Sequence, residues 1–507
     1  MAITNGDLLN SSPAPGQQVL STNYLDLADA SNAGWGQQYL PDLMEKEAEV
    51  FGPRTISGFL SQVGAEESMT ADQVVWSEQG RLHLSYKGIV QDDDEAEGGQ
   101  IEITTDIDGN DIGTDHGVRP NDLILVAGNN TIVRCVVNHL DVATPGDGAD
   151  RITVSPYGFG NLQGAGLTDS TVVTILVYGS EFKKGSAADY RTTANEANFK
   201  TFSNKPIIMR DYYEVSGSDA SKIGWVEVST ENGQSGYLWY LKSEAETRLR
   251  FTDYIEMAML ESKLGGPSKP NTGDEVYGGF IANADLTDNT IYGTNTGDIT
   301  GTQGLFDAIE TRGNVTSGVT GVNAATDLAE FDAILAEFDR QGAIEEYMMF
   351  VNRSTSLAID DMLASMNSYG AGGTSYGVFN NSEDMALNLG FTGFRRGSYD
   401  FYKSDFRYLN DKATRGSIND AAGSAAIRGV MIPAGTSSVY DQTVGASMKK
   451  PFLHVRFRAS QTDNRRFKTW VTGSVGAATS ALDAMQLHFL TERCLVTQGA
   501  NNFMLMK

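Results

Sequence analysis

The chain has little cysteine, little proline and no long apolar run. Its two cysteines, Cys135 and Cys494, lie in apolar stretches and form no C-x-x-C pair, so we expect buried free thiols in a reducing compartment rather than a disulfide framework. Twelve prolines against 55 aperiodic glycines exclude a collagen-like fibre. No stretch of about 18 apolar residues could span a bilayer, and no signal peptide is evident, which predicts a cytosolic chain without membrane contact.

Positive charge is also scarce. The 507 residues carry 38 Lys and Arg against 65 Asp and Glu, a net charge of −27, which would repel phosphate and excludes a strong sequence-reading nucleic-acid binder. The nearest basic cluster has two interleaved aromatic residues, Phe199 and Phe202. It comprises Lys183, Lys184, Lys200, Lys205 and Arg210. Nucleic-acid contact is one interpretation, but the overall charge favours pairing with acidic neighbours in an assembly.

The N-terminal part predicts an arm followed by β-structure. Residues 1–50 are polar and suggest an extended arm, and the length suggests roughly three lobes. Apolar and polar residues alternate from Gln73 to Val90 around Glu78-Gln79-Gly80, which predicts a β-hairpin. Trp76, Leu82, Leu84 and Tyr86 would form either one adhesive face of this hairpin or a local core.

An acidic run, Gln91 to Gly99, predicts a solvated linker after the hairpin. Short β-rich stretches follow up to about residue 179, broken by turns rich in Gly, Asn, Pro and Asp. These features predict a small β-domain inserted over about residues 92–179.

The clearest helix spans residues 237–264 and is stopped by Gly265-Gly266-Pro267. Its expected apolar row recurs every three or four residues. The row is Leu238, Leu241, Ala245, Leu249, Thr252, Ile255 and Met259. A strand at residues 346–351 between helices at 327–341 and 354–366 predicts an α/β lobe. Later strands, at 398–409, 427–432, 452–458, 467–472 and 488–497, would build a sheet against the long helix, giving an α+β fold.

Three motifs have a chemical and a structural interpretation. Ser375 lies in a G-x-S-x-G match, the pattern of a hydrolase nucleophile, but no apolar strand precedes it. Clustered oxygen ligands between Asp106 and Asp115 resemble a calcium loop, although the glycine falls too early for an EF-hand, and the neighbouring His116 is expected to be solvated. The loop ligands are Asp106, Asp108, Asn110, Asp111 and Asp115. We assign no catalytic residue, cofactor or metal.

The order of parts resembles the major capsid proteins of tailed double-stranded DNA phages with the HK97 fold. The strongest stretch is residues 204–261, NKPIIMRDYYEVSGSDASKIGWVEV and then GYLWYLKSEAETRLRFTDYIEMAMLES, which resembles the lead into the spine helix of large phage capsid subunits, including those of crAss-like phages. The C-terminal LHFLTERCLVTQGANNFMLMK resembles their closing P-domain strands.

This resemblance implies named regions. They are an N-arm at 1–50, an E-loop region at 51–200 with its insertion, a P-domain part at 201–300 with the spine helix at 237–264, a mainly A-domain region at 301–440, and an A-domain return with closing P-domain strands at 441–507.

The resemblance also implies a shell subunit that assembles as pentamers and hexamers around phage DNA, with portal, scaffold and decoration proteins as further partners. Expected assembly contacts in the E-loop hairpin are Trp76, Arg81, Leu82, Leu84, Tyr86 and Lys87, and hinge candidates are Gly80, Gly88, Gly265 and Gly266. Alternatives are a cytosolic serine hydrolase using Ser375 and an encapsulin-like nanocompartment shell.

Overall fold

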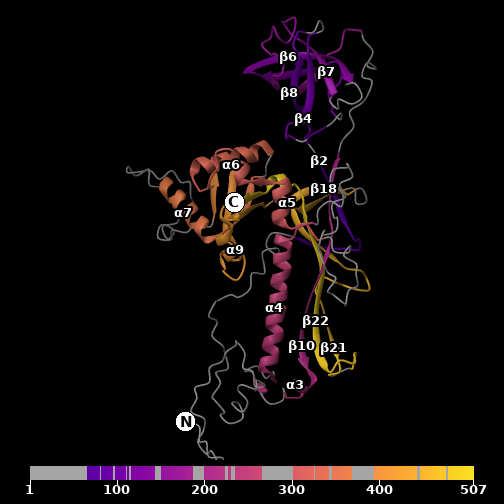
Figure 1. Ribbon diagram of the computed structural model, residues 1–507, viewed down its shortest axis with the longest axis vertical. Coiled ribbons are helices and arrows are strands. Elements are labelled where there is room, and N and C mark those ends of the chain that lie inside the picture. Colours follow the sequence, from indigo (N-terminus) through magenta and orange to yellow (C-terminus); the bar gives the residue numbers. More distant parts are fainter. Residues whose placement is uncertain are drawn as a thin grey trace, which may run out of the picture. The chain divides into compact units, whose positions relative to one another are not determined.

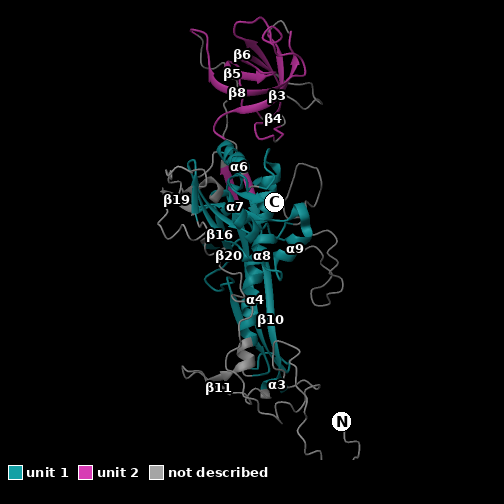
Figure 2. Cartoon of the chain, turned by 90° about the vertical axis from the view of Figure 1, so that its left-hand side faces the viewer, with its two compact units in different colours: residues 1–75, 203–507 teal, residues 76–202 magenta. Residues whose placement is uncertain are grey.

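The structure is a computed structural model of the 507-residue chain. It describes residues 65–79, 81–94, 98–109, 111–112, 116–142, 150–185, 199–222, 227–229, 235–264, 301–324, 326–341, 345–367, 393–434, 436–441, 446–475 and 478–507. The fold is mixed α+β, as expected, and divides into two compact units. One comprises residues 76–202, and the other comprises residues 1–75 with 203–507 (Figure 2).

The first unit contains a closed β-barrel. Its strands run in the order β3-β4-β7-β6-β5-β8, and every neighbouring pair is antiparallel. The strands are β3 (Ser85–Asp92), β4 (Gln100–Asp106), β5 (Asp122–Gly128), β6 (Thr131–Val142), β7 (Asp150–Pro156) and β8 (Val172–Ser180). Alternate side chains such as Ile101, Ile124 and Ile152 point inward and are fully buried, so the barrel has a core of its own.

The predicted hairpin over residues 73–90 is wrong. Strand β2 (Val74–Gln79) pairs with β9 (Phe199–Asn204), whereas β3 pairs with β4 and β8. The barrel satisfies the backbone groups on both edges of β3, while a hairpin would satisfy only one edge.

The acidic run is also not a linker. Its described residues include the end of β3, and buried Asp93 next to that end accepts a hydrogen bond from the backbone N–H of Asp169 at 3.2 Å. Gly98 and Gly99 have φ angles of 120° and 151°, and a side chain at Gly98 would meet the carbonyl oxygen of Val154 at 2.2 Å. The first strand of the barrel is therefore β3, which begins at Ser85.

The second unit contains a five-stranded sheet and the long helix (Figure 1). The sheet follows the order β1-β20-β22-β10, and β21 also pairs with β22. Its strands are β1 (Ala65–Met69), β10 (Ile207–Ser216), β20 (Leu453–Arg458), β21 (Lys468–Gly473) and β22 (Ala484–Thr497). Strand β1 is parallel to β20, and the other pairs are antiparallel.

Helix α4 (Leu238–Glu261) confirms the predicted long helix and packs against β10 and β22 (Figure 1). Phe251 and Ile255 lie in one buried cluster with Leu487 and Phe489 of β22. The expected apolar row is correct at Ile255 and Met259 but wrong at Ala245 and Leu249, which are exposed. The side chains of Leu238 and Leu241 lie outside the described part. The face of α4 that packs on the sheet therefore includes Phe251, which is absent from the predicted apolar row.

A six-stranded sheet in the order β13-β23-β17-β14-β16-β15 forms the rest of the second unit. Its strands are β13 (Asn314–Val315), β14 (Glu346–Val351), β15 (Gly393–Arg396), β16 (Tyr399–Asp405), β17 (Gly429–Pro433) and β23 (Met504–Met506). Its helices include α6 (Leu328–Gln341) and α7 (Arg353–Asn367), which confirms the predicted strand between two helices. Strands β16 and β17 belong here, so the expectation that they join the sheet along the long helix is wrong, and only the end of α4, at Met259 and Leu260, shares a core with β17.

Shorter elements connect these layers. They are α3 (Gly217–Lys222), β11 (Glu227–Ser229), β12 (Ser235–Tyr237), α5 (Leu305–Arg312), η4 (Thr316–Gly318), α8 (Arg407–Asn410), α9 (Arg415–Ala422), η6 (Gly423–Ala425), β18 (Thr436–Asp441), β19 (Ala446–Pro451) and η7 (Ala500–Asn502). Across the described ranges, no helix is both long and apolar enough to cross a bilayer.

Candidate functional site: a charged cluster on the long sheet

Edge strand β1 is fastened to the sheet by ion pairs. Glu67 lies opposite Arg456 in the parallel register and binds it at 2.7 Å. Its neighbour Glu66 binds Arg466 and approaches Arg493 at 3.6 Å. An edge strand exposes unpaired backbone groups, and charged side chains limit unwanted pairing there. The carboxylates of Glu66 and Glu67 therefore bind β1 to the rest of the sheet and place negative charge along its exposed edge.

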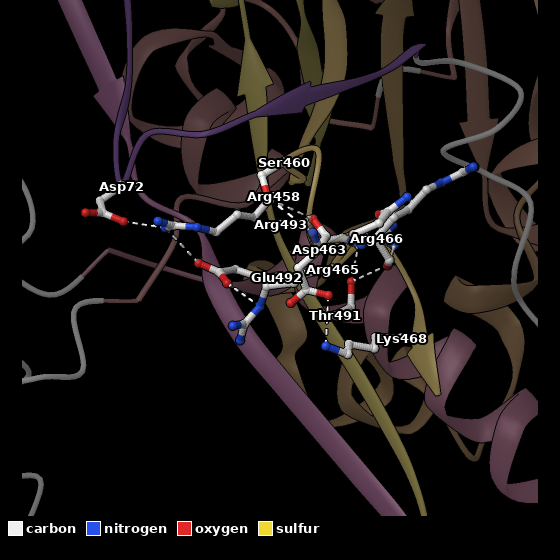
Figure 3. Close-up of polar contacts among 11 residues, drawn as sticks. Asp72, Arg458, Ser460, Asp463, Arg465, Arg466, Lys468, Thr491, Glu492 and Arg493 are labelled. Carbon is white, nitrogen blue, oxygen red and sulfur yellow. Dashed lines mark hydrogen bonds and ion pairs between the residues drawn. The ribbon is translucent and has the colours of Figure 1, made fainter. Parts of the chain in front are cut away.

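Glu492 lies at the centre of the cluster (Figure 3). Its side chain is 7% exposed, forms an ion pair with Arg465 at 2.8 Å and accepts a hydrogen bond from Arg458 at 3.3 Å, while Arg458 also binds Asp72 just after β1. Burial lowers the pKa of Arg493, whose guanidinium donates to the Thr491 hydroxyl at 2.9 Å. A buried carboxylate without its cations would be strongly destabilising, so the group acts as a unit.

A hollow of about 290 Å³ lies beside the cluster. Its lining is Arg210, Asp463, Arg465, Lys468, Trp470 and Leu490. Lys468 binds Asp463 at 2.8 Å, whereas Arg210 has no ion-pair or hydrogen-bond partner among the described residues. Because Arg465 is paired with Glu492 and Lys468 with Asp463, Arg210 supplies the uncompensated positive charge of the described lining.

A row of rings crosses the sheet next to this hollow. His488 of β22 lies opposite Tyr212 of β10 and Trp470 of β21, with ring centroids 6.0 and 5.1 Å away. The His488 ring nitrogen Nε2 is 2.7 Å from the Thr472 hydroxyl. Burial, and then the positive charge of Arg210, lower the pKa of His488 below its usual value of 6.5. This row favours a neutral imidazole at neutral pH.

The expected adhesive face of the hairpin does not exist as one surface. Trp76 is buried in the β2–β9 ribbon, where its ring lies 6.3 Å from Phe202 and its indole N–H donates to Glu78 at 2.9 Å. Tyr86 instead lies in the barrel core, and its hydroxyl accepts from the Gly117 N–H at 2.7 Å. The residues belong to different elements because the chain leaves the ribbon before it enters the barrel.

The other expected contact residues belong to the barrel unit. Leu84 packs against the barrel core, Leu82 is 89% exposed, and Lys87 lies half-buried in β3. Arg81 donates to Asp108 at 2.9 Å, so this carboxylate of the suspected cation loop already has a cationic partner. Their roles in assembly stay a prediction.

Several sequence-based candidates fall outside the described residues. They are Ser375, Gly80, Gly265, Gly266, Asn110 and Asp115. Gly88 is described and lies within β3, where an added Cβ would meet the carbonyl oxygen of Glu102 at 2.4 Å, so close strand packing explains this glycine. His116 was expected to be solvated but is buried 6.3 Å from the Tyr86 ring.

The predicted basic cluster is divided between the units, with Lys183 and Lys184 after β8 and Arg210 on β10. Sequence reasoning missed the arginines of the sheet instead. The alternation Arg456-Phe-Arg458 marks two arginines that share one orientation along a strand, next to Arg465-Arg466-Phe-Lys468. That spacing could have indicated the cluster, although its acidic partners lie far away in sequence.

This chain is similar to known proteins in structure but not in sequence. No family model matches the chain, and no characterised protein sequence matches it. A solved structure from Microbacterium phage Oxtober96 is similar over 94% of this chain and 99% of its own, at 8% identity and a TM-score of 0.37.

Two capsid structures are also similar. The capsid of a native GTA particle covers 95% of this chain and 99% of its own at 11% identity and a TM-score of 0.36. The capsid structure of cyanophage P-SCSP1u covers 65% of this chain and 80% of its own at 7% identity and a TM-score of 0.32.

Proposed function

We propose that the chain is the major capsid protein of a tailed double-stranded DNA phage, assembling as pentamers and hexamers into an icosahedral head shell. One arrangement carries the proposal. The 24-residue helix α4 packs along the β10–β22 pair, and the two-stranded ribbon β2–β9 connects to this same sheet through β1 and β10. This is the order of spine helix, P-domain and E-loop that the sequence resemblance implies.

The remaining parts are assigned by the same correspondence. The five-stranded sheet with α4 is the P-domain, and the ribbon with the inserted barrel is the E-loop region. The six-stranded sheet with α6 and α7 is the A-domain. Residues 1–50 would form the N-arm that precedes β1. In this assignment, the charged cluster fixes the strand through which the N-arm enters the P-domain.

The proposed partners are other copies of the chain, the portal, and scaffold and decoration proteins of the same phage. The protein would be assembled in the host cytoplasm and reside in the virion. A net charge of −27 supports only weak, nonspecific contact with packaged DNA, because like charges repel across a screening length of about 8 Å at physiological salt. A lineage within the crAss-like phages is part of the proposal.

Sedimentation velocity of the expressed full chain, alone and with its neighbouring phage genes, tests the proposal. Pentamers, hexamers or larger closed particles are expected. A uniformly small oligomer that reacts with a fluorophosphonate probe, and loses that reaction in Ser375→Ala, would instead establish the hydrolase alternative. Shells that enclose an enzyme rather than DNA would indicate a nanocompartment.

A further inference from the structure

The outward surface of the barrel divides into a polar half and an apolar half. On the polar half, outward residues of β4 and β7 bind one another or their neighbours. Glu102 of β4 accepts from Gln91 at 2.5 Å and lies 3.9 Å from Arg151 of β7. Asn138 donates to Ser155 at 2.7 Å. These groups have the mixed, hydrogen-bonded character of an ordinary solvated surface.

The apolar half is centred on β8. Its outward residues alternate with the buried Val173 and Ile175, and they include Val172, 68% exposed, and Tyr178, 47% exposed. Leu176 lies between these two residues on the same face.

The strand register extends this face onto both neighbours of β8. Leu125 of β5 lies directly opposite Leu176, and Ile89 of β3 lies opposite Val172. On β6, next to β5, Ile132 is 69% exposed. These six outward residues are the apolar face: Ile89, Leu125, Ile132, Val172, Leu176 and Tyr178. A contiguous apolar surface of this kind marks a contact that another molecule covers.

The charged residues next to the apolar face indicate which kind of partner would bind there. Lys87 of β3 lies opposite Thr174, and Arg134 of β6 lies opposite Leu125. Lys183 and Lys184 are exposed just after β8. The face is therefore apolar and cationic on a chain whose net charge is −27.

We propose that the apolar face docks onto a second copy of this chain. A second copy supplies acidic surface that complements these cations, and protein side chains can bury the leucine and valine groups, which DNA phosphates cannot. Because the barrel is closed, the contact is made by side chains and not by strand addition. The inference rests on the proposed function, since a shell brings copies of one chain together.

A double variant, Val172→Glu with Leu176→Glu in the full chain, tests the docking. Both side chains point outward, so we expect an unchanged circular dichroism spectrum and melting temperature but at least a tenfold loss of self-association in sedimentation velocity. The matched control is Thr104→Glu on the polar half, which should associate like the parent. Equal loss in control and double variant, or none in either, would overturn the proposal.

The remaining outcomes separate this inference from the capsid proposal. A parent chain that forms only small oligomers, which the double variant abolishes, keeps the docking face while contradicting the shell. A parent that stays monomeric at all concentrations contradicts both. A double variant that assembles normally but no longer retains a double-stranded DNA fragment would assign the face to nucleic acid and overturn the docking.

Discussion

The barrel and the long sheet are both β-structures, but they are assembled from very different parts of the chain. The barrel uses consecutive strands between Ser85 and Ser180. The long sheet joins β1 to β20, and the ion pair Asp72–Arg458 that fastens it links residues 386 positions apart. Local contacts form sooner than distant ones because less chain must be ordered first. The comparison implies that the barrel folds by itself, whereas the sheet forms only when both ends of the chain meet.

The largest test of this independence is Phe251→Ala in α4. Phe251 is 1% exposed, with its ring 5.6 Å from Phe467 and 5.9 Å from Phe489, so truncation should cost about 3–5 kcal/mol. Hydrogen exchange in urea should show loss of protection in β10 and β22 while β5 and β6 stay protected. Equal loss in the barrel would show that the two units unfold together.

A smaller effect is expected from Glu492→Ala in the charged cluster. The change leaves Arg458 and Arg465 without their shared buried carboxylate and should destabilise the long sheet by about 2–3 kcal/mol, below the range for a fully buried pair because both arginines are partly exposed. Chemical denaturation measures it, and exchange should increase first in β1. Glu492→Gln, which keeps the shape, is the matched control; a loss equal to that of Glu492→Ala would assign the effect to charge alone.

His488 should add a modest pH dependence to the sheet and none to the barrel. Its folded pKa is lowered by burial and by Arg210, so the unfolded chain binds the proton more readily. This contribution to stability is fully present above the unfolded pKa of about 6.5 and is lost as pH falls below it. Unfolding followed from pH 8 to 5 should show this slope, and His488→Gln should remove it. An unchanged slope in the variant would place its origin elsewhere.

The smallest effect is expected from Arg81→Ala in the barrel unit. The Arg81–Asp108 pair is 42% and 43% exposed, and such surface pairs contribute about 0–1 kcal/mol. Thermal unfolding should therefore change little, and less in high salt. A loss of stability as large as that of Glu492→Ala would contradict the distinction between this exposed ion pair and the buried charged cluster.

The sequence predicted the elements better than their partners. Helix α4 and the strand between α6 and α7 followed from periodicity, because each fits within one local stretch. The prediction of a hairpin at residues 73–90 was wrong because alternation identifies a strand but not its partner strand. Strand β2 pairs with β9, which lies more than 100 residues later in the sequence. The prediction of a solvated linker at residues 91–99 was wrong for a related reason. Asp93 accepts a hydrogen bond from the backbone N–H of Asp169, which is distant in the sequence.

The charged cluster shows the same limit at the level of a site. Arg456 and Arg458 are visible in the sequence, but their carboxylate partners come from β1 and β22, which only the folded sheet brings together. Alternation predicts Trp76 and Tyr86 on one face, but they lie in a ribbon and in a barrel core. Residue type indicates the chemistry, and long-range pairing decides where it acts.

Electron microscopy of the purified full chain, with and without its neighbouring phage genes, tests the central claim that this is a shell subunit. We expect closed icosahedral particles or rings of five and six copies, with the barrel of each copy in contact with another. Uniform small particles under every condition, with no rings and no closed shells, would contradict it.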